Sequence, residues 1–348
     1  MNHNITRRSA VTSLGAMATL GFPAIVKAQQ TVTLRLHQLL PAQAPIPAKA
    51  IIPWAQKVEN ASGGRLKIQL FHSMQLGGAP PTLFDQAKDG VVDITWTILG
   101  YTPGRFNRAE VFELPFMTGT NPEASSKAFQ EYVEKHAAED FREVKLIAVH
   151  THGPGLLHTK QPVTGLEALR GMKIRGGSRV INNMLNKLGA TPVGMPVPAV
   201  TEALSKGVID GTTIPWEVVP ALKVHELVKN HTTFAGDKGF YTQTFAFSMN
   251  KASYERLPAD LKKVIDDNSG IETAALFGRA MADGDRAGLA AAQQAKNNIV
   301  ALDVAETQRW LRTASAVESD WVKEMNAKGI DGAKLASEAR MILAKYAR

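Results

Sequence analysis

Apolar and polar residues alternate in short runs near the beginning of the chain, and runs with helical spacing separate them. Val32, Leu34 and Leu36 occupy every second position of the first run, which is typical of a strand with one buried face. The predicted elements are, in order, strand 31–37, helix 41–62, strand 65–71, helix 82–88 and strand 91–98. Strands that alternate with helices favour an open, mostly parallel α/β sheet, which binds ligands at the carboxyl ends of its strands.

A second group of strands and helices follows. Its predicted elements are helix 121–144, strands 146–150 and 156–159, helix 198–206, and strands 208–210, 231–234 and 242–249. One short pattern occurs in both groups: QAKDGVVD at 86–93 and LSKGVID at 204–210 each indicate a helix end, a glycine cap and a buried strand. This repetition and the chain length favour two α/β lobes of similar construction.

The remaining residues are nearly all helical in pattern, with helices predicted over 259–297, 305–328 and 332–347. We therefore divide the chain into four parts. They are an export signal at 1–28, a first lobe at 29–150 to which later segments return, a second lobe at 151–250, and a helical region at 251–348.

The first 28 residues have the features of an export signal. Arg7 and Arg8 precede a mildly apolar stretch, and Val26-Lys27-Ala28 fits cleavage after a small residue. The paired arginines favour the twin-arginine route, with general secretion as the alternative. The apolar stretch contains too many polar residues and glycines to span a bilayer, so we expect a periplasmic protein.

Composition excludes several classes of protein. Removal of residues 1–28 takes away three basic residues and no acid, so the formal charge falls from +8 to +5. The basic residues are dispersed among acids rather than collected in one stripe, which argues against nucleic-acid binding. There is no cysteine, so disulfides, thiol catalysis and cysteine-based metal sites are excluded.

Arg175 is the strongest candidate for ligand binding. It ends a short apolar strand, and a Gly176-Gly177-Ser178 turn and an amphipathic helix follow it. A guanidinium can hold a carboxylate through two parallel hydrogen bonds, and the amides of a helix N-terminus favour the same negative charge. The alternative is a structural arginine paired with Glu167 or Asp210. From its position alone, the two interpretations are equally good.

The chain resembles the solute-binding subunits of TRAP transporters, the DctP-like periplasmic proteins, from about residue 31 to the C-terminus. The motifs that carry the resemblance are GGRLKIQLFHSMQLGG at 63–78, DQAKDGVVDIT at 85–95, VFELPFM at 111–117, MKIR at 172–175, LGATPVGMP at 188–196 and EALSKGVIDGTTIP at 202–215. The resemblance implies a two-lobed fold like that of periplasmic binding proteins, with C-terminal helices that brace both lobes. It also implies that Arg175 pairs with the carboxylate of an organic acid, and that a membrane permease receives the ligand.

The sequence departs from the family pattern at three positions. Ile214 stands where family members commonly carry an asparagine that contacts the ligand, Pro154 stands where many carry a second arginine, and Gly176 replaces the usual proline. Part of the usual polar site is therefore missing. Ile214 with Trp216, and with Trp96, Tyr101, Phe240 or Tyr241 nearby, would suit a less hydroxylated or an aromatic acid, although ordinary packing explains a single aromatic residue more often than not.

Further ligand contacts are expected from residues of both lobes. Thr213 lies beside Ile214, while Thr95, Thr97 and Tyr101 follow the third strand, where the first lobe reaches the ligand in the family. Gln75 begins a glycine-rich turn that could bring backbone amides to the cleft. Arg105 could replace the missing arginine, but an exposed loop arginine is usually only solvated.

Enzyme motifs are absent from the sequence: there is no G-x-S-x-G, H-E-x-x-H, P-loop or G-x-G-x-x-G. His150 and His152 share one face of a strand, but no third metal ligand is evident, so we expect ordinary hydrogen bonds there. We expect a monomer without cofactor that binds an organic acid and docks on TRAP permease subunits. The alternatives are an exported enzyme and a sensor subunit that presents its ligand.

Overall fold

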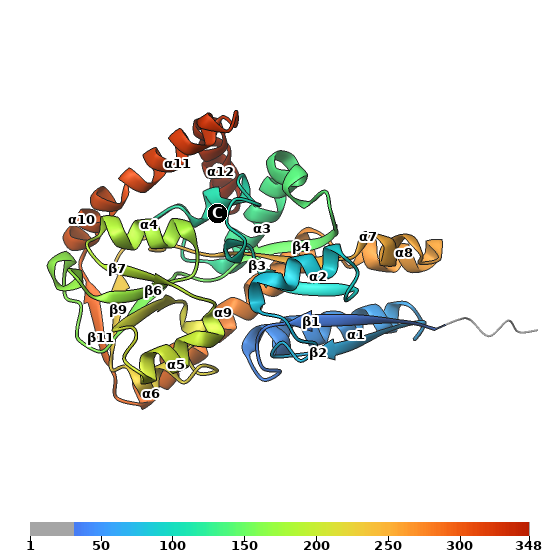
Figure 1. Ribbon diagram of the computed structural model, residues 1–348, viewed down its shortest axis with the longest axis horizontal. Helices are drawn as coiled ribbons and strands as arrows, with labels where there is room; N and C mark the ends of the chain where they lie inside the picture. The colour runs from blue at the N-terminus through green and yellow to red at the C-terminus, as the bar shows by residue number, and fades with distance from the viewer. Residues whose placement is uncertain (1–30, 348) are drawn as a thin grey trace, which may run out of the picture. The chain divides into compact units, whose positions relative to one another are not determined.

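Two β-sheets organise residues 31–347, the part of the chain that the computed structural model describes (Figure 1). The predicted export signal at 1–28 lies outside these residues. The first sheet has the order β2-β1-β3-β10-β4, and the second has the order β11-β9-β5-β8-β6-β7. The strands are β1 (Val32–Gln38), β2 (Leu66–Phe71), β3 (Ile94–Ile98), β4 (Lys145–Thr151), β5 (Leu156–Thr159), β6 (Lys173–Gly176), β7 (Thr191–Gly194), β8 (Gly211–Ile214), β9 (Asn230–Phe234), β10 (Thr244–Met249) and β11 (Asn298–Leu302).

The helices are mostly shorter than the sequence pattern predicts, because turns divide the long ones. They are α1 (Ile52–Ala61), α2 (Leu83–Lys88), α3 (Pro122–Tyr132), α4 (Arg179–Lys187), α5 (Val200–Ser205), α6 (Val224–Leu227), α7 (Lys251–Glu255), α8 (Ala259–Asp267), α9 (Ile271–Gln294), α10 (Val304–Ala314), α11 (Ala316–Ala327) and α12 (Gly332–Tyr346). The predicted helix over 259–297 is divided into α8 and α9 at Gly270, whose φ of +78° is incompatible with a continuous helix.

The first sheet has a parallel core with one antiparallel strand. Strand β1 pairs in parallel with β2 and β3, as the alternation of strands and helices predicts. Strand β10 then runs antiparallel between β3 and β4. We had placed this segment in the second lobe, but its residues are buried on both faces, and an apolar run of that kind fits the centre of either sheet.

The repeated helix-glycine-strand pattern has the same geometry in both halves. Gly90 follows α2 with a φ of +74°, and Gly207 follows α5 with a φ of +71°. Each glycine lies four residues before a strand, β3 in the first sheet and β8 in the second. The strand predicted at 208–210 therefore begins later than expected, and Val208 is 50% exposed in the preceding turn.

The chain passes between the sheets three times, through the segments 151–156 and 234–244 and through helix α9. The backbone amide of Gly270, just before α9, donates to the Ile147 carbonyl of the first sheet. At the other end, the Asn297 side chain donates to the His225 carbonyl of the second lobe. Figure 1 shows α9 crossing between the two groups of strands.

The C-terminal helices pack on both lobes, as the family resemblance implies. Helices α10 and α11 contact α4, whereas α12 packs against α3, which covers β4. Strand β11 interrupts this helical region and joins the edge of the second sheet beside β9. The region at 251–348 is therefore not purely helical.

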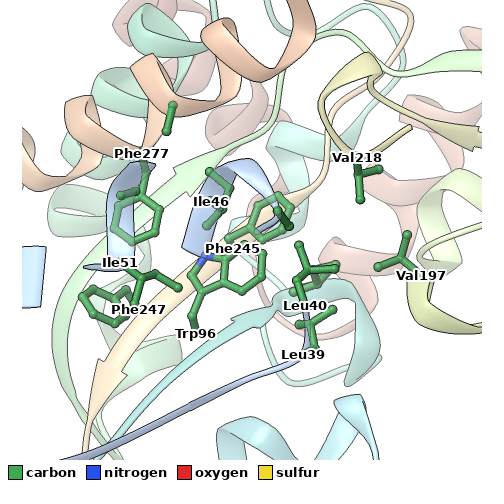
Figure 2. Packing of buried hydrophobic residues seen from close by; sticks show 14 of the residues in the cluster. Leu39, Leu40, Ile46, Ile51, Trp96, Val197, Val218, Phe245, Phe247 and Phe277 are labelled. Atoms are coloured by element: carbon green, nitrogen blue, oxygen red, sulfur yellow. The ribbon is translucent and has the colours of Figure 1, made fainter. Parts of the chain in front are cut away.

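Apolar residues of the two lobes meet in a shared core. One buried cluster contains Leu39, Leu40 and Trp96 from the first lobe together with Val197 and Val218 from the second. Figure 2 shows Leu39 and Leu40 between Trp96 and the two valines. A second buried cluster also includes residues of both sheets. Each buried cluster therefore contains residues of both lobes, and within residues 31–347 neither lobe has a core of its own. The space between the lobes is lined by apolar side chains.

Candidate ligand-binding site

Arg175 occupies a fully buried position in β6, between β7 and β8 of the second sheet. The chain turns immediately after it, and the Ser178 side chain caps α4 by accepting a hydrogen bond from the Ile181 amide. A Cβ at Gly177 in this turn would lie 2.3 Å from the Gln243 side-chain oxygen, so any other residue would displace that amide group. The local sequence therefore places a guanidinium beside a capped helix start.

The guanidinium of Arg175 is bonded only to neutral groups. Its Nε donates to the Met195 carbonyl at 2.9 Å and its Nη1 donates to the Thr213 carbonyl at 3.1 Å. Its Nη2 is buried and has no hydrogen-bond partner within residues 31–347. A buried cation without a counter-charge is costly, so the position favours an anion that the polypeptide does not supply.

The two acids that could have made Arg175 a structural residue have other partners. Glu167 forms an ion pair with Arg309, and a carboxylate oxygen of Asp210 accepts from the Lys173 amide at 2.8 Å. No ion pair links Arg175 to an acid anywhere in the described chain, residues 31–347. The alternative of an internal ion pair is therefore wrong.

Three neutral side chains surround the guanidinium. The Tyr101 hydroxyl accepts from the Val197 amide at 2.7 Å, which links the first lobe to the second. Burial raises the pKa of Tyr101 and that of Tyr241, and the positive charge of Arg175 opposes both changes. Burial, reinforced by Arg175, lowers the pKa of His152 to about 4. None of these groups supplies a negative charge at neutral pH.

A cavity of about 370 Å³, counted with the part that opens to solvent, lies between the lobes. His152 lines it, whereas Arg175, Tyr101 and Tyr241 are not among its lining residues. Three of its lining residues are polar: His152, Gln243 and Glu217. The others are apolar and come from both lobes: Leu39, Leu40, Trp96, Ile98, Val197, Ile214, Pro215, Val218, Phe245 and Met281. Trp96 and Phe245 stack with ring centroids 5.2 Å apart and an interplanar angle of 12°. A flat apolar body with one anionic end matches these surroundings.

The residues predicted from the third strand lie on its other face. Trp96 and Ile98 line the cavity and pair with Phe247 and Phe245 of β10, whereas Thr95 and Thr97 alternate with them. Successive side chains of a strand point to opposite faces, so Thr95 and Thr97 do not reach the cavity. The two threonines predicted as ligand contacts therefore lie on the face of β3 opposite to the cavity-lining residues.

Ile214, Thr213 and Tyr101 are brought together near Arg175, whereas Trp216 and Phe240 are not. Ile214 lines the cavity, and the Thr213 hydroxyl donates to the Arg175 carbonyl at 3.1 Å. Trp216 and Phe240 line a different cavity, of about 860 Å³ including its solvent-exposed part. There Phe240 stacks on Phe234, with centroids 4.3 Å apart, and Trp216 packs on His158 and His231.

The remaining predicted contacts have ordinary structural roles. Gln75 is exposed and its side-chain oxygen accepts from the His72 amide at 3.0 Å. Arg105 pairs with Asp85 at 2.8 Å and lies over the Phe84 ring. His150 Nε2 accepts from the Trp96 indole at 2.8 Å, and within residues 31–347 no three His, Cys, Asp or Glu side chains form a metal-binding group.

Sequence reasoning missed most of the cavity. Phe245 lies in β10 and Gln243 directly precedes it, in a segment that the sequence pattern assigns to the other lobe, and the pattern at His152 suggests only a metal ligand. Glu217 was not considered, although an acid three residues after Ile214 would have been a detectable signal. The Nε2 atom of Gln243 and the Oε1 atom of Glu217 are buried without hydrogen-bond partners within residues 31–347.

Glu217 and Asp285 form a buried acidic pair where the short helix Trp216–Val218 meets α9. A carboxylate oxygen of Asp285 accepts from the Glu217 amide at 2.8 Å. Burial and the charge of Asp285 raise the pKa of Glu217 to about 8, and burial raises the pKa of Asp285 to about 7. At neutral pH Glu217 therefore holds a proton that it would lose in an unfolded chain.

We expect this pair to make the protein less stable as pH rises. Between the ordinary pKa of a glutamate and a pKa of about 8, the folded state binds more protons than the unfolded state, so the free energy of unfolding falls with pH and then levels off. Glu217→Gln removes this titration. The stability of the variant relative to wild type should increase by on the order of 2 kcal/mol between pH 5 and pH 9. Urea unfolding at both pH values measures it, and a pH-independent difference would contradict the shifted pKa.

Two α/β lobes that meet at a cavity, with a buried unpaired arginine beside it, define a two-lobed ligand-binding protein. Residues 37–328 match the model of the bacterial extracellular solute-binding proteins, family 7, which is the DctP family, and the chain belongs to that family. It is a solute-binding protein of the TRAP transporter class. None of the helices within residues 31–347 is both long and apolar enough to cross a membrane.

Several solved structures of this class are similar over nearly their whole length. A TRAP solute-binding protein of Rhodoferax ferrireducens, with copurified benzoate, is 49% identical with a TM-score of 0.89, and the match covers 91% of this chain and 98% of that one. A marine metagenome protein specific for aromatic acids, with 3-hydroxybenzoate, is 47% identical with a TM-score of 0.89 and coverages of 91% and 99%. A Bordetella bronchiseptica protein with bound mandelate is 30% identical with a TM-score of 0.83 and coverages of 90% and 99%.

Proposed function

We propose that this protein captures an aromatic carboxylate between its lobes and that Arg175 holds the carboxylate. The single observation that carries the proposal is the buried Arg175 guanidinium, whose Nη2 has no partner within residues 31–347 and which no acid there neutralises. A bound carboxylate would supply the missing charge and accept from Nη2, and in a water-excluded site this pairing is strong.

The proposed class of ligand follows from the apolar part of the cavity. Trp96 and Phe245 line the cavity with aromatic rings that stack on each other, and Ile214 lines it where the family resemblance leads us to expect an asparagine. An aliphatic dicarboxylate would leave its second charge among leucine, valine and isoleucine side chains, which is unfavourable. The ligands named for the similar solved structures, benzoate, 3-hydroxybenzoate and mandelate, agree with this choice.

We further propose that the protein acts in the periplasm as a monomeric receptor without catalysis and delivers its ligand to the membrane subunits of a TRAP transporter. The Tyr101 to Val197 hydrogen bond and the shared apolar core favour the closed arrangement of the lobes. A ligand that contacts both lobes would stabilise that arrangement, and a membrane partner could recognise it. A sensor subunit would need the same closed state.

A thermal-shift screen tests the proposed ligand class. Benzoate, 3-hydroxybenzoate, succinate, glucose and choline would each be added to the purified protein. A ligand at about 100 times its dissociation constant should add about 2.7 kcal/mol to the free energy of unfolding. We expect shifts from the aromatic acids and little or none from the others. A shift from glucose or choline, with none from the acids, would contradict the proposal.

A further inference from the structure

Glu217 supplies an unused hydrogen-bond acceptor to the cavity. It follows β8 in the short helix Trp216–Val218, is 3% exposed and lines the same cavity as His152 and Gln243. Its Oε1 has no hydrogen-bond partner, and no basic residue pairs with it, within residues 31–347. Buried polar atoms are normally bonded, so this oxygen indicates a missing donor.

The packing around Glu217 fixes the position of its side chain. A Cβ at Gly284 of α9 would lie 2.5 Å from the Glu217 Cγ, so only glycine leaves room for the carboxyl group there. The same added Cβ would lie 3.0 Å from the Cβ of Pro45, which belongs to the first lobe. Asp285 bonds to the Glu217 backbone amide and not to its carboxyl group. The side chain is thus confined between α9 and the first lobe while its Oε1 remains unpaired.

The charge state of Glu217 is compatible with an anionic ligand in the same cavity. The groups that face it are Asp285 of α9, which raises its pKa, and the Ile46 amide, which lowers it, while burial raises it further. His152, on the same cavity, is neutral because burial lowers its pKa. The Glu217 carboxyl group is therefore protonated at neutral pH, and it retains lone pairs that accept a hydrogen bond.

The unpartnered polar atoms at this site are complementary to one kind of molecule. Within residues 31–347, Nη2 of Arg175 and Nε2 of Gln243 are donors without acceptors, and Oε1 of Glu217 has lone pairs without a donor. Gln243 and Glu217 line the cavity, whereas Arg175 does not. The donors suit a carboxylate, and the acceptor suits a hydroxyl group. The stacked Trp96 and Phe245 rings suit the flat body that joins them.

We propose that Glu217 is a specificity residue that accepts a hydrogen bond from a hydroxyl group on the ring of the bound acid, so that hydroxylated aromatic acids bind better than unsubstituted ones. This inference rests on the proposed function. An unsubstituted ring would leave the buried oxygen without a donor, and a site built to bond a hydroxyl group discriminates against ligands that lack it.

Calorimetric titration tests the assignment by a ratio of affinities. Dissociation constants of benzoate, 3-hydroxybenzoate and 4-hydroxybenzoate would be measured for wild type, Glu217→Gln and Glu217→Leu. In wild type we expect one hydroxybenzoate to bind about tenfold more tightly than benzoate. Glu217→Leu should reduce this ratio to about one, while Glu217→Gln, which keeps an acceptor oxygen, should retain part of it. Glu226→Leu, a change at an exposed acid in α6, is the matched control and should keep the wild-type ratio.

The outcomes distinguish failure of the role proposed for Glu217 from failure of the proposed function. Benzoate binding to wild type without any preference for a hydroxybenzoate, or a preference that survives in Glu217→Leu, would overturn the role of Glu217 and leave the proposed function intact. Failure of all three acids to bind wild type would overturn both. The melting temperature of each variant without ligand shows whether it folds, and if Glu217→Leu does not fold, loss of the ratio in a folded Glu217→Ala variant tests the same point.

Discussion

Arg175→Ala should weaken the binding of benzoate by about 100-fold or more, because the ligand carboxylate would then be buried without a counter-charge. Wild-type Arg175 is fully buried, donates to the Met195 and Thr213 carbonyls and pairs with no acid within residues 31–347, so its positive charge is available to the ligand. Isothermal titration calorimetry measures the dissociation constants. Arg175→Lys keeps the charge but loses the planar fork, and it should restore only part of the affinity.

The stability of Arg175→Ala provides an independent check on the same reasoning. The substitution removes a buried charge, which favours folding, but it also leaves the Met195 and Thr213 carbonyls without a donor, which opposes folding.

The matched control for the binding experiment is Arg105→Ala, since Arg105 pairs with Asp85 outside the cavity and should not affect binding. A folded Arg175→Ala that binds benzoate as wild type does would refute the anion site.

The sequence predicts the elements of this fold better than their assignment to a lobe. Alternation in residues 31–37 and the glycines at 90 and 207 are local signals, and β1, β3 and β8 follow from them within a few residues. The position of β10 between β3 and β4 depends on a segment that returns to the first sheet from far along the chain. An apolar run contains no local information about which of two sheets will bury it.

The local sequence indicated one residue of the candidate site without deciding its role. An arginine at the end of an apolar strand, before a helix start, can bind an anion or pair with an acid, and only the structure shows that Arg175 is fully buried with no acid paired to it within residues 31–347. The facing of β3 could not be obtained in this way, because both faces of residues 94–98 are buried, so the alternation of threonines with apolar residues does not show which face meets the ligand. Thr95 and Thr97 were chosen as hydrogen-bond donors, yet the cavity is lined by the aromatic and aliphatic residues between them.

Gln243 and Glu217 show a third property that the sequence does not reveal, which is whether a buried polar atom has a hydrogen-bond partner. Glu217 is a single acid in an apolar segment and Gln243 lies between two threonines, and only the packing of both lobes shows that a side-chain oxygen or nitrogen of each has no partner within the described chain. Hydrogen-bond satisfaction is a property of the tertiary structure, so a residue type cannot reveal it. The polar groups that we propose to select among aromatic acids are therefore the ones that the sequence shows least.

Gly288→Ala should lower the free energy of unfolding by about 2 to 4 kcal/mol, although alanine is the better helix former. A Cβ at this position of α9 would lie 1.9 Å from the Trp216 carbonyl oxygen and 2.6 Å from the carbonyl carbon. Helix α9 and the backbone at Trp216 would therefore have to move apart. Trp216 is followed directly by Glu217, and the displacement should also weaken binding of an aromatic acid. Urea unfolding and calorimetric titration measure the two effects.

The neighbouring residue provides the matched control for Gly288→Ala. Ala287 is exposed on the same helix, and Ala287→Gly should cost only about 1 kcal/mol, from helix propensity alone, without changing ligand affinity. The two substitutions are the reverse of each other at adjacent positions. Helix propensity alone predicts that Gly288→Ala is more stable than wild type, whereas the close approach of α9 to Trp216 predicts a larger loss of stability. A Gly288→Ala variant more stable than wild type would show that α9 does not depend on this backbone contact to align Glu217 with the cavity.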